Sequence, residues 1–91
     1  MAVTVKIPPQ LRAATGGDSA PKAEGGTVGE VLEAVYAQHG ELKDRIAGED
    51  GAIRRFVNVY LDGEDIRFLQ DLGTPVPDGA ELTILPAVAG G

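Results

Sequence analysis

The sequence ends in a tight turn, a strand and a short tail, in the order Pro77-Asp78-Gly79-Ala80-Glu81-Leu82-Thr83-Ile84-Leu85-Pro86-Ala87-Val88-Ala89-Gly90-Gly91. Proline, aspartate and glycine at 77–79 are typical of a tight turn. Because side chains alternate along a strand, Leu82 and Ile84 are expected to face the core and Thr83 and Leu85 to face outward. The five residues after Pro86 reach roughly 17 Å when extended. The terminal glycines have no Cβ, so such a tail can enter a channel too narrow for other residues.

The rest of the chain predicts four further strands. Val3, Val5 and Ile7 alternate with polar residues, which predicts a first strand that ends at the following prolines. A weak second strand is expected near residues 20–24 and should pair back on the first, with Pro21 marking it as an edge or irregular strand. Residues 56–61 predict a central strand, and Asp-Gly at 62–63 turns it into a short strand around residues 66–68.

One main helix is predicted between the second and third strands. Thr27 is a good N-cap, and Glu30 completes a capping box. The stripe that should face the sheet consists of Val28, Val31, Leu32 and Val35. Gly40 is expected to stop the helix at the C′ position, and Leu42 and Ile46 suggest a further helical turn. The order β-β-α-β-β-β predicts an α+β roll with a mixed sheet, in which the first and last strands can pair centrally in parallel.

Composition limits the function. The chain has 91 residues, enough for one small domain, and a net charge of −6. That charge argues against binding to nucleic acid or to an anionic membrane, and it favours a partner with a basic docking face. There is no cysteine, which excludes thiolate catalysis and disulfides. The apolar runs are too short for a bilayer span or a signal peptide, so we expect a cytoplasmic protein.

The best candidate for a reactive group is the terminal carboxylate of Gly91. No nucleophile–base pair or metal-binding set is recognisable in the sequence. His39 is the only histidine, and its position suits a cation at a helix C-terminus better than a catalytic role. The alternative interpretation of the tail is a frayed chain end without a function.

Strand alternation also predicts a partner-binding patch. Phe56, Asn58 and Tyr60 should face away from the core, on the same side as Leu85. If they are exposed together, they form an apolar patch near the tail, and such patches usually mark interfaces. Alternatively, one or two of these side chains are covered by a loop or are simply exposed. Arg54 and Arg55, just before this strand, either pair with an acidic partner or remain solvated charges.

The chain resembles the ThiS/MoaD family of ubiquitin-like sulfur carriers, and within it the cysteine-biosynthesis carriers of the CysO type. The resemblance rests on Leu11-Arg12, Thr15-Gly16-Gly17, Arg55-Phe56-Val57-Asn58-Val59-Tyr60, Glu64-Asp65-Ile66-Arg67-Phe68 and Asp78-Gly79-Ala80-Glu81-Leu82-Thr83-Ile84-Leu85-Pro86-Ala87-Val88-Ala89-Gly90-Gly91. It implies a β-grasp domain over residues 1–86 and a flexible Gly-Gly tail over residues 87–91.

The resemblance also implies a chemistry. An α-carboxylate is an anion at neutral pH and a poor electrophile. In the family, an ATP-dependent, ubiquitin-activating-like adenylyltransferase converts the carboxylate, here that of Gly91, to an acyl-adenylate, and a sulfur donor then leaves a thiocarboxylate. The tail residues Val88, Ala89 and Gly90 would carry it to an acceptor. For CysO-type carriers the acceptor is a PLP-dependent cysteine synthase, and a metal-dependent peptidase releases the product. The alternative acceptor is an enzyme that makes another sulfur-containing metabolite, such as a thiosugar.

The carrier itself is then a protein cosubstrate that needs no cofactor, not an enzyme. Two other functions share this fold and tail. One is the small subunit of molybdopterin synthase, which is a stable complex partner. The other is a ubiquitin-like protein modifier, which becomes joined to target lysines through Gly91.

Overall fold

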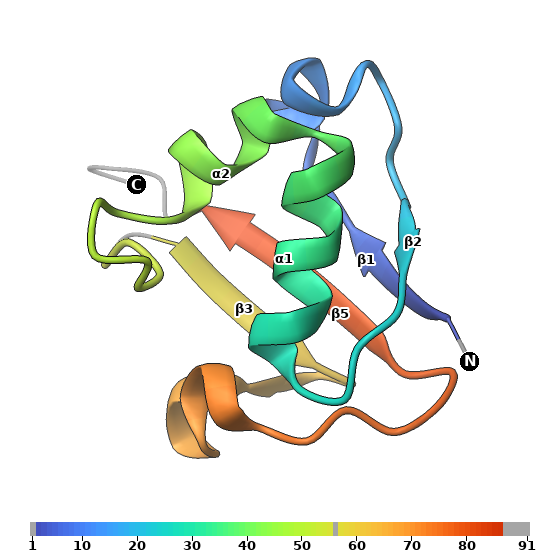
Figure 1. Cartoon of the computed structure of the whole chain (residues 1–91), viewed down its shortest axis with the longest axis vertical. Coiled ribbons are helices and arrows are strands. Elements are labelled where there is room, and N and C mark those ends of the chain that lie inside the picture. Colours follow the sequence, from blue (N-terminus) through green and yellow to red (C-terminus); the bar gives the residue numbers. More distant parts are fainter. Residues whose placement is uncertain (1, 56, 87–91) are drawn as a thin grey trace.

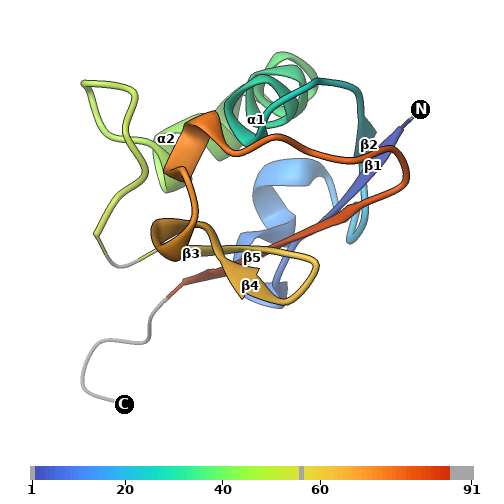
Figure 2. The ribbon, with the colours of Figure 1, turned by 90° about the horizontal axis from the view of Figure 1, so that it is seen from below.

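The fold is a five-stranded mixed sheet with two helices across one face, as Figures 1 and 2 show for the computed structural model. The structure describes residues 2–55 and 57–86. The strands are β1 (Val3–Lys6), β2 (Lys22–Ala23), β3 (Val57–Leu61), β4 (Glu64–Asp65) and β5 (Glu81–Pro86). The helices are α1 (Val28–Gln38) and α2 (Gly40–Ile46), and the 3-10 turns are η1 (Pro9–Thr15), η2 (Ile66–Phe68) and η3 (Asp71–Gly73).

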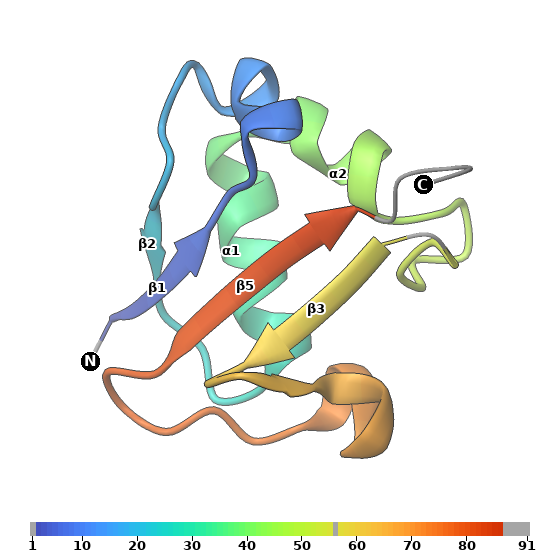
Figure 3. The same ribbon diagram turned by 180° about the vertical axis from the view of Figure 1, so that it is seen from behind.

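The last strand lies in the middle of the sheet. The strand order is β2-β1-β5-β3-β4, and β5 runs parallel to β1 and antiparallel to β3 (Figure 3). The predicted α+β roll with a central parallel pair is therefore confirmed. β5 pairs with β1 over residues 81–83 and with β3 as far as Pro86, so its end is positioned by β3 alone.

The core forms where the sheet meets the helices. The side chains predicted to face inward are buried, and they belong to β1, β3, β5 and α1: Val3, Val5, Val57, Val59, Leu61, Leu82, Ile84, Val28, Val31, Leu32 and Val35. Leu42 and Ile46 of α2 complete this core. The period of two gives the sheet one apolar face, and the i, i+3, i+4 spacing gives α1 an apolar stripe. These two surfaces pack against each other.

The main helix begins and ends as predicted. The Thr27 side chain accepts a hydrogen bond from the Glu30 backbone N–H at 3.2 Å. The Glu30 carboxylate accepts one from the Gly26 N–H at 2.8 Å, one residue earlier than in a standard capping box. α1 ends at Gln38, and its C-cap is His39, whose φ of −136° breaks the helical path. Gly40 is therefore at the C′ position, as predicted, although its φ is not positive, and it is also the first residue of α2, which contains the expected further helical turn.

The second hairpin corrects another prediction. Asp62 and Gly63 both have positive φ (49° and 90°), as a two-residue type I′ turn requires. The strand after the turn is only Glu64–Asp65, and residues 66–68 form the turn η2 rather than the predicted strand. The physical cause is a local cap: the Asp65 carboxylate accepts a hydrogen bond from the Arg67 N–H at 2.9 Å, which starts a helical turn.

The first two strands pair antiparallel, as predicted, although their connection is long. It contains η1, and Pro21 precedes the edge strand β2. Among residues 2–55 and 57–86, no helix has the length and apolarity that crossing a membrane would require.

Candidate functional site

The candidate site surrounds the end of β5. Pro86, the last described residue, pairs with Val57 at the start of β3. The predicted tail residues Val88, Ala89, Gly90 and Gly91 lie outside the described residues, as does Phe56. The division of the chain into a domain and a tail at Pro86 accordingly stays a prediction.

Three of the predicted contact residues lie together on the face of the sheet that the helices leave uncovered. Asn58 pairs with Leu85 across β3 and β5, and Tyr60 follows two residues along β3, opposite Thr83. Leu85 is 45% exposed, whereas Asn58 and Tyr60 are half-buried. We call Asn58, Tyr60 and Leu85 the outer patch. It adjoins the point where β5 ends, and its partner-binding role stays a prediction.

An arginine that the sequence analysis did not single out organises the edge of this site. The Arg67 guanidinium donates hydrogen bonds to the Val57 carbonyl at 2.8 Å, to the Arg55 carbonyl at 3.0 Å and to Asn58 Oδ1 at 3.1 Å. A fourth, longer contact of 3.5 Å reaches the Arg54 carbonyl. Arg67 therefore ties η2 to the beginning of β3, next to Pro86. No sequence signal distinguishes this arginine, because its partners are mainly backbone carbonyls 10–13 residues away.

The two neighbouring arginines behave differently. Arg54 donates to the Asp44 carbonyl at 3.0 Å and so connects this segment to α2. The Arg55 side chain is exposed and has no hydrogen bond or ion pair within the described part of the chain. A cationic group thus stands near the end of β5 in a protein whose net charge is −6.

The other titratable groups show no catalytic arrangement. Burial raises the pKa of Tyr36 to about 12, with a further contribution from the negative charge of Glu33, and Tyr36 belongs to α1 in the core. His39 is half-buried at the junction of α1 and α2, where the sequence placed it at a helix end. Over residues 2–55 and 57–86, no three His, Cys, Asp or Glu side chains are grouped so that they could hold a metal ion.

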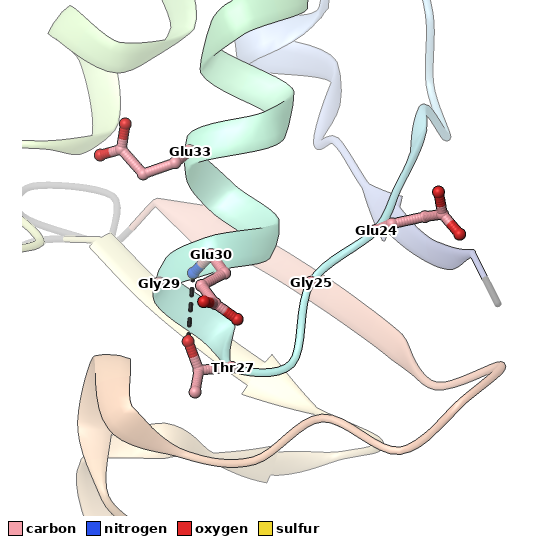
Figure 4. Close-up of a pocket in the computed structure, with 6 residues that line it drawn as sticks. All are labelled: Glu24, Gly25, Thr27, Gly29, Glu30 and Glu33. Carbon is pink, nitrogen blue, oxygen red and sulfur yellow. Dashed lines mark hydrogen bonds between the residues drawn. The ribbon is translucent and has the colours of Figure 1, made fainter.

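An open depression lies at the start of α1, on the helix side of the sheet and away from the end of β5 (Figures 1 and 4). It is lined by Glu24, Gly25, Thr27, Gly29, Glu30 and Glu33. Thr27 and Glu30 are engaged in capping α1, and Gly25 packs closely against the backbone at Val31. The structural role of these residues accounts for the depression, so the chemistry is better sought at the end of β5.

The sheet order, with a parallel pair formed by the first and last strands and α1 packed across it, defines a ubiquitin-like β-grasp fold. The model of the ThiS family matches residues 5–91, and the chain belongs to that family. This confirms the resemblance found in the sequence. It also makes the protein a small carrier rather than an enzyme and supports the general role of a sulfur carrier.

Individual relatives agree with this assignment. The sulfur carrier protein CysO of Mycobacterium tuberculosis (strain ATCC 25618 / H37Rv) is 44% identical over 93 residues, covering 100% of both chains. A chain in the crystal structure of the Amycolatopsis orientalis BexX/CysO complex matches with a TM-score of 0.92 and 49% identity, covering 99% of this chain and 100% of that one. Small archaeal modifier protein 1 of Haloferax volcanii is 37% identical over 65 residues, covering 71% of this chain and 70% of that protein.

Proposed function

We propose that the protein carries sulfur as a thiocarboxylate at Gly91. The Gly91 carboxylate attacks the α-phosphorus of ATP in the active site of an adenylyltransferase, which forms an acyl-adenylate and releases pyrophosphate. Hydrosulfide then displaces AMP and loses its proton, so that the chain ends in a thiocarboxylate. If the nucleophile is instead an enzyme persulfide, an acyl disulfide forms, and a thiol of the enzyme cleaves it to the thiocarboxylate and a disulfide. This anion delivers the sulfur to a biosynthetic enzyme.

The observation that carries the proposal is the position of β5. This strand lies between β1 and β3, and it ends at Pro86 beside the exposed Leu85. β5 pairs with β1 over residues 81–83 and with β3 as far as Pro86, so the sheet supplies a fixed point from which a short tail would extend. This arrangement suits a carrier that must bring one terminal group into the active sites of at least two enzymes.

The acceptor in this proposal is a sulfur-incorporating enzyme, either a PLP-dependent cysteine synthase or an enzyme of another sulfur-containing metabolite. In the first case a metal-dependent peptidase would release the cysteine adduct. The similarity to CysO supports this class of partner, and the relative from Amycolatopsis orientalis was crystallised in a complex of BexX and CysO. We propose that such partners contact the outer patch together with Phe56 while the tail residues Val88, Ala89 and Gly90 occupy the active-site channel.

The proposal is tested by incubating the purified chain with the adenylyltransferase of its source organism, ATP and a sulfur donor. Intact-protein and fragment mass spectrometry should find one oxygen replaced by sulfur at Gly91. A chain lacking Gly90 and Gly91 should remain unmodified while keeping the circular-dichroism spectrum and melting temperature of the full chain. Sulfur uptake by the shortened chain would contradict the proposal.

A second candidate function is protein modification, which the similarity to the small archaeal modifier protein favours. It predicts an isopeptide bond between Gly91 and lysines of target proteins. Expression of a tagged chain in its source organism, followed by denaturing purification, separates the two functions. Covalent high-mass adducts with a Gly-Gly remnant on target lysines would support modification, and their absence would leave the sulfur carrier. The small subunit of molybdopterin synthase, the other alternative, would instead copurify in a stable complex with its large subunit.

A further inference from the structure

The most exposed large apolar side chain in the described part of the chain is Phe68, at 87%. It ends η2, and the next residue, Leu69, is 39% exposed. Burying a phenylalanine side chain is favourable by roughly 1.5–3 kcal/mol, and this gain is not realised in the free protein. Phe68 is separate from the outer patch, which the proposed function already uses.

The turn that carries Phe68 is firmly anchored on both sides. Ile66 is only 1% exposed and holds the start of η2 in the core. Arg67 is bonded through its backbone to Asp65 and through its guanidinium to β3. After Phe68, the Leu69 N–H donates to the Ile66 carbonyl at 2.9 Å, and the Gln70 N–H donates to Thr74 Oγ1 at 2.9 Å. An aromatic side chain on such an ordered turn binds a partner with little further loss of backbone entropy.

The charges around Phe68 define the chemistry of that partner. Residues 62–71 contain four carboxylates and a single cation, Arg67. The Arg67 guanidinium is bonded to the carbonyls of Arg55 and Val57, whereas Glu64 and Asp71, which lie within four residues of Phe68 in the sequence, are exposed. The complementary surface is an apolar pocket bordered by lysine or arginine.

The turn η2, which carries Phe68, lies on the same edge of the molecule as the end of β5, from which the tail continues. Figures 1 and 3 show η2 and the end of β5 along the same edge of the molecule, with the start of β3 between them. The hydrogen bonds of Arg67 connect the two directly, because they reach Val57, the residue that pairs with Pro86. One enzyme surface can therefore contact Phe68 while it receives the tail.

We propose that Phe68, with Leu69 and the flanking carboxylates Glu64 and Asp71, docks into an apolar pocket with a cationic border on the enzyme that adenylates Gly91. The inference rests on the proposed function. We choose the adenylating enzyme as the partner because it must hold the triphosphate of ATP beside the tail, and proteins bind triphosphates with arginine and lysine. Cationic groups near that active site would also attract the carboxylates of Glu64 and Asp71.

The test is ATP–pyrophosphate exchange by the purified adenylyltransferase of the source organism, measured as a function of carrier concentration. Phe68→Ala should raise the KM for the carrier about 10- to 100-fold with an unchanged kcat, and Phe68→Tyr should restore most of the loss. Glu64→Gln should raise KM about threefold at low ionic strength and have less effect at high salt. The matched control is Gln10→Ala, an exposed truncation in η1 that should leave KM unchanged.

Melting temperatures of all variants show whether they remain folded, and Phe68→Ala should match the parent chain because its side chain is exposed. A KM for Phe68→Ala within twofold of the parent would overturn the inference while leaving the proposed function intact. The inference would also be overturned if Phe68→Ala impaired only sulfur transfer to the acceptor enzyme. The same holds if the carrier proved to be a dimer that dissociates on Phe68→Ala. If the parent chain supported no exchange at all, the proposed function would fail and this inference with it.

Discussion

Arg67 offers the sharpest test of how the end of β5 is held in place. Its guanidinium joins η2 to the start of β3 and to the segment before it through three hydrogen bonds of 2.8–3.1 Å and one of 3.5 Å. Arg67→Ala removes all of them and leaves the backbone of η2 in place, because the Asp65 cap uses the Arg67 N–H rather than its side chain. The substitution therefore isolates the side-chain connection.

The expected loss follows from the number and kind of these bonds. A hydrogen bond to a charged group contributes about 1.5–3 kcal/mol, but Arg67 is exposed and its bonds share one group, so they do not add. We expect Arg67→Ala to lower the free energy of unfolding by about 2 kcal/mol, which corresponds to roughly 8–16 °C in melting temperature for a domain of this size. Arg67→Lys should recover less than half of this, because an ammonium group lacks the planar fork that reaches several carbonyls.

The measurement is urea and thermal unfolding followed by circular dichroism. Arg55→Ala is the matched control, since the Arg55 side chain has no hydrogen bond or ion pair within the described part of the chain, and its backbone carbonyl is retained. It should stay within about 0.5 kcal/mol of the parent. If the two alanine variants lost the same amount of stability, the guanidinium would not hold β3 and η2 together, and the argument from its hydrogen bonds would be refuted.

Three further predictions concern other parts of the molecule. Gly25→Ala places a Cβ 2.7 Å from the Val31 backbone nitrogen, so it should lower the free energy of unfolding by about 1–3 kcal/mol in chemical denaturation. The control is Gly40→Ala, where no atom lies within 4 Å of the added Cβ and the free energy of unfolding should not fall. Equal losses of stability in the two variants would contradict the packing argument. Because the pKa of Tyr36 is raised to about 12 in the fold and lies near 10 in the unfolded chain, the unfolded state loses its proton first. Stability should hold below about pH 10 and fall by roughly 1–3 kcal/mol as the pH rises toward 12; an equally steep decline in Tyr36→Phe, followed by circular dichroism, would assign it to other groups. Leu85→Ala should weaken binding to the sulfur-accepting enzyme about tenfold in calorimetry with little change in melting temperature, since the side chain is 45% exposed; unchanged affinity would remove Leu85 from the interface.

Much of the fold could be predicted because it depends on local periodicity. Alternation identified the inward faces of β1, β3 and β5, and the Thr27 cap with its apolar stripe located α1. The Asp-Gly pair gave the type I′ turn after β3, because only a few residues tolerate positive φ at both positions. The error occurred over a short segment. Three residues at 66–68 are too few for a period to distinguish a strand from a 3-10 turn.

The candidate site, too, could be predicted only in part. The sequence alone brought Asn58, Tyr60 and Leu85 to one face, because a period of two applies equally to two paired strands. The same pattern, together with the resemblance of the tail, led to the family to which the chain belongs.

Only the tertiary structure decided the surroundings of that face. A strand over 66–68 would have placed Ile66 and Phe68 on the same side, whereas η2 buries Ile66 and exposes Phe68. The bonds of Arg67 to Arg55 and Val57 span 10–12 residues and form where the β3–β4 hairpin brings η2 back to the start of β3. The sequence by itself therefore determined the strands, the helix and the class of protein, since these depend on the order of neighbouring residues. The exposed aromatic and the arginine that connects it to the end of β5 depend on contacts between distant segments, which only the folded chain brings together.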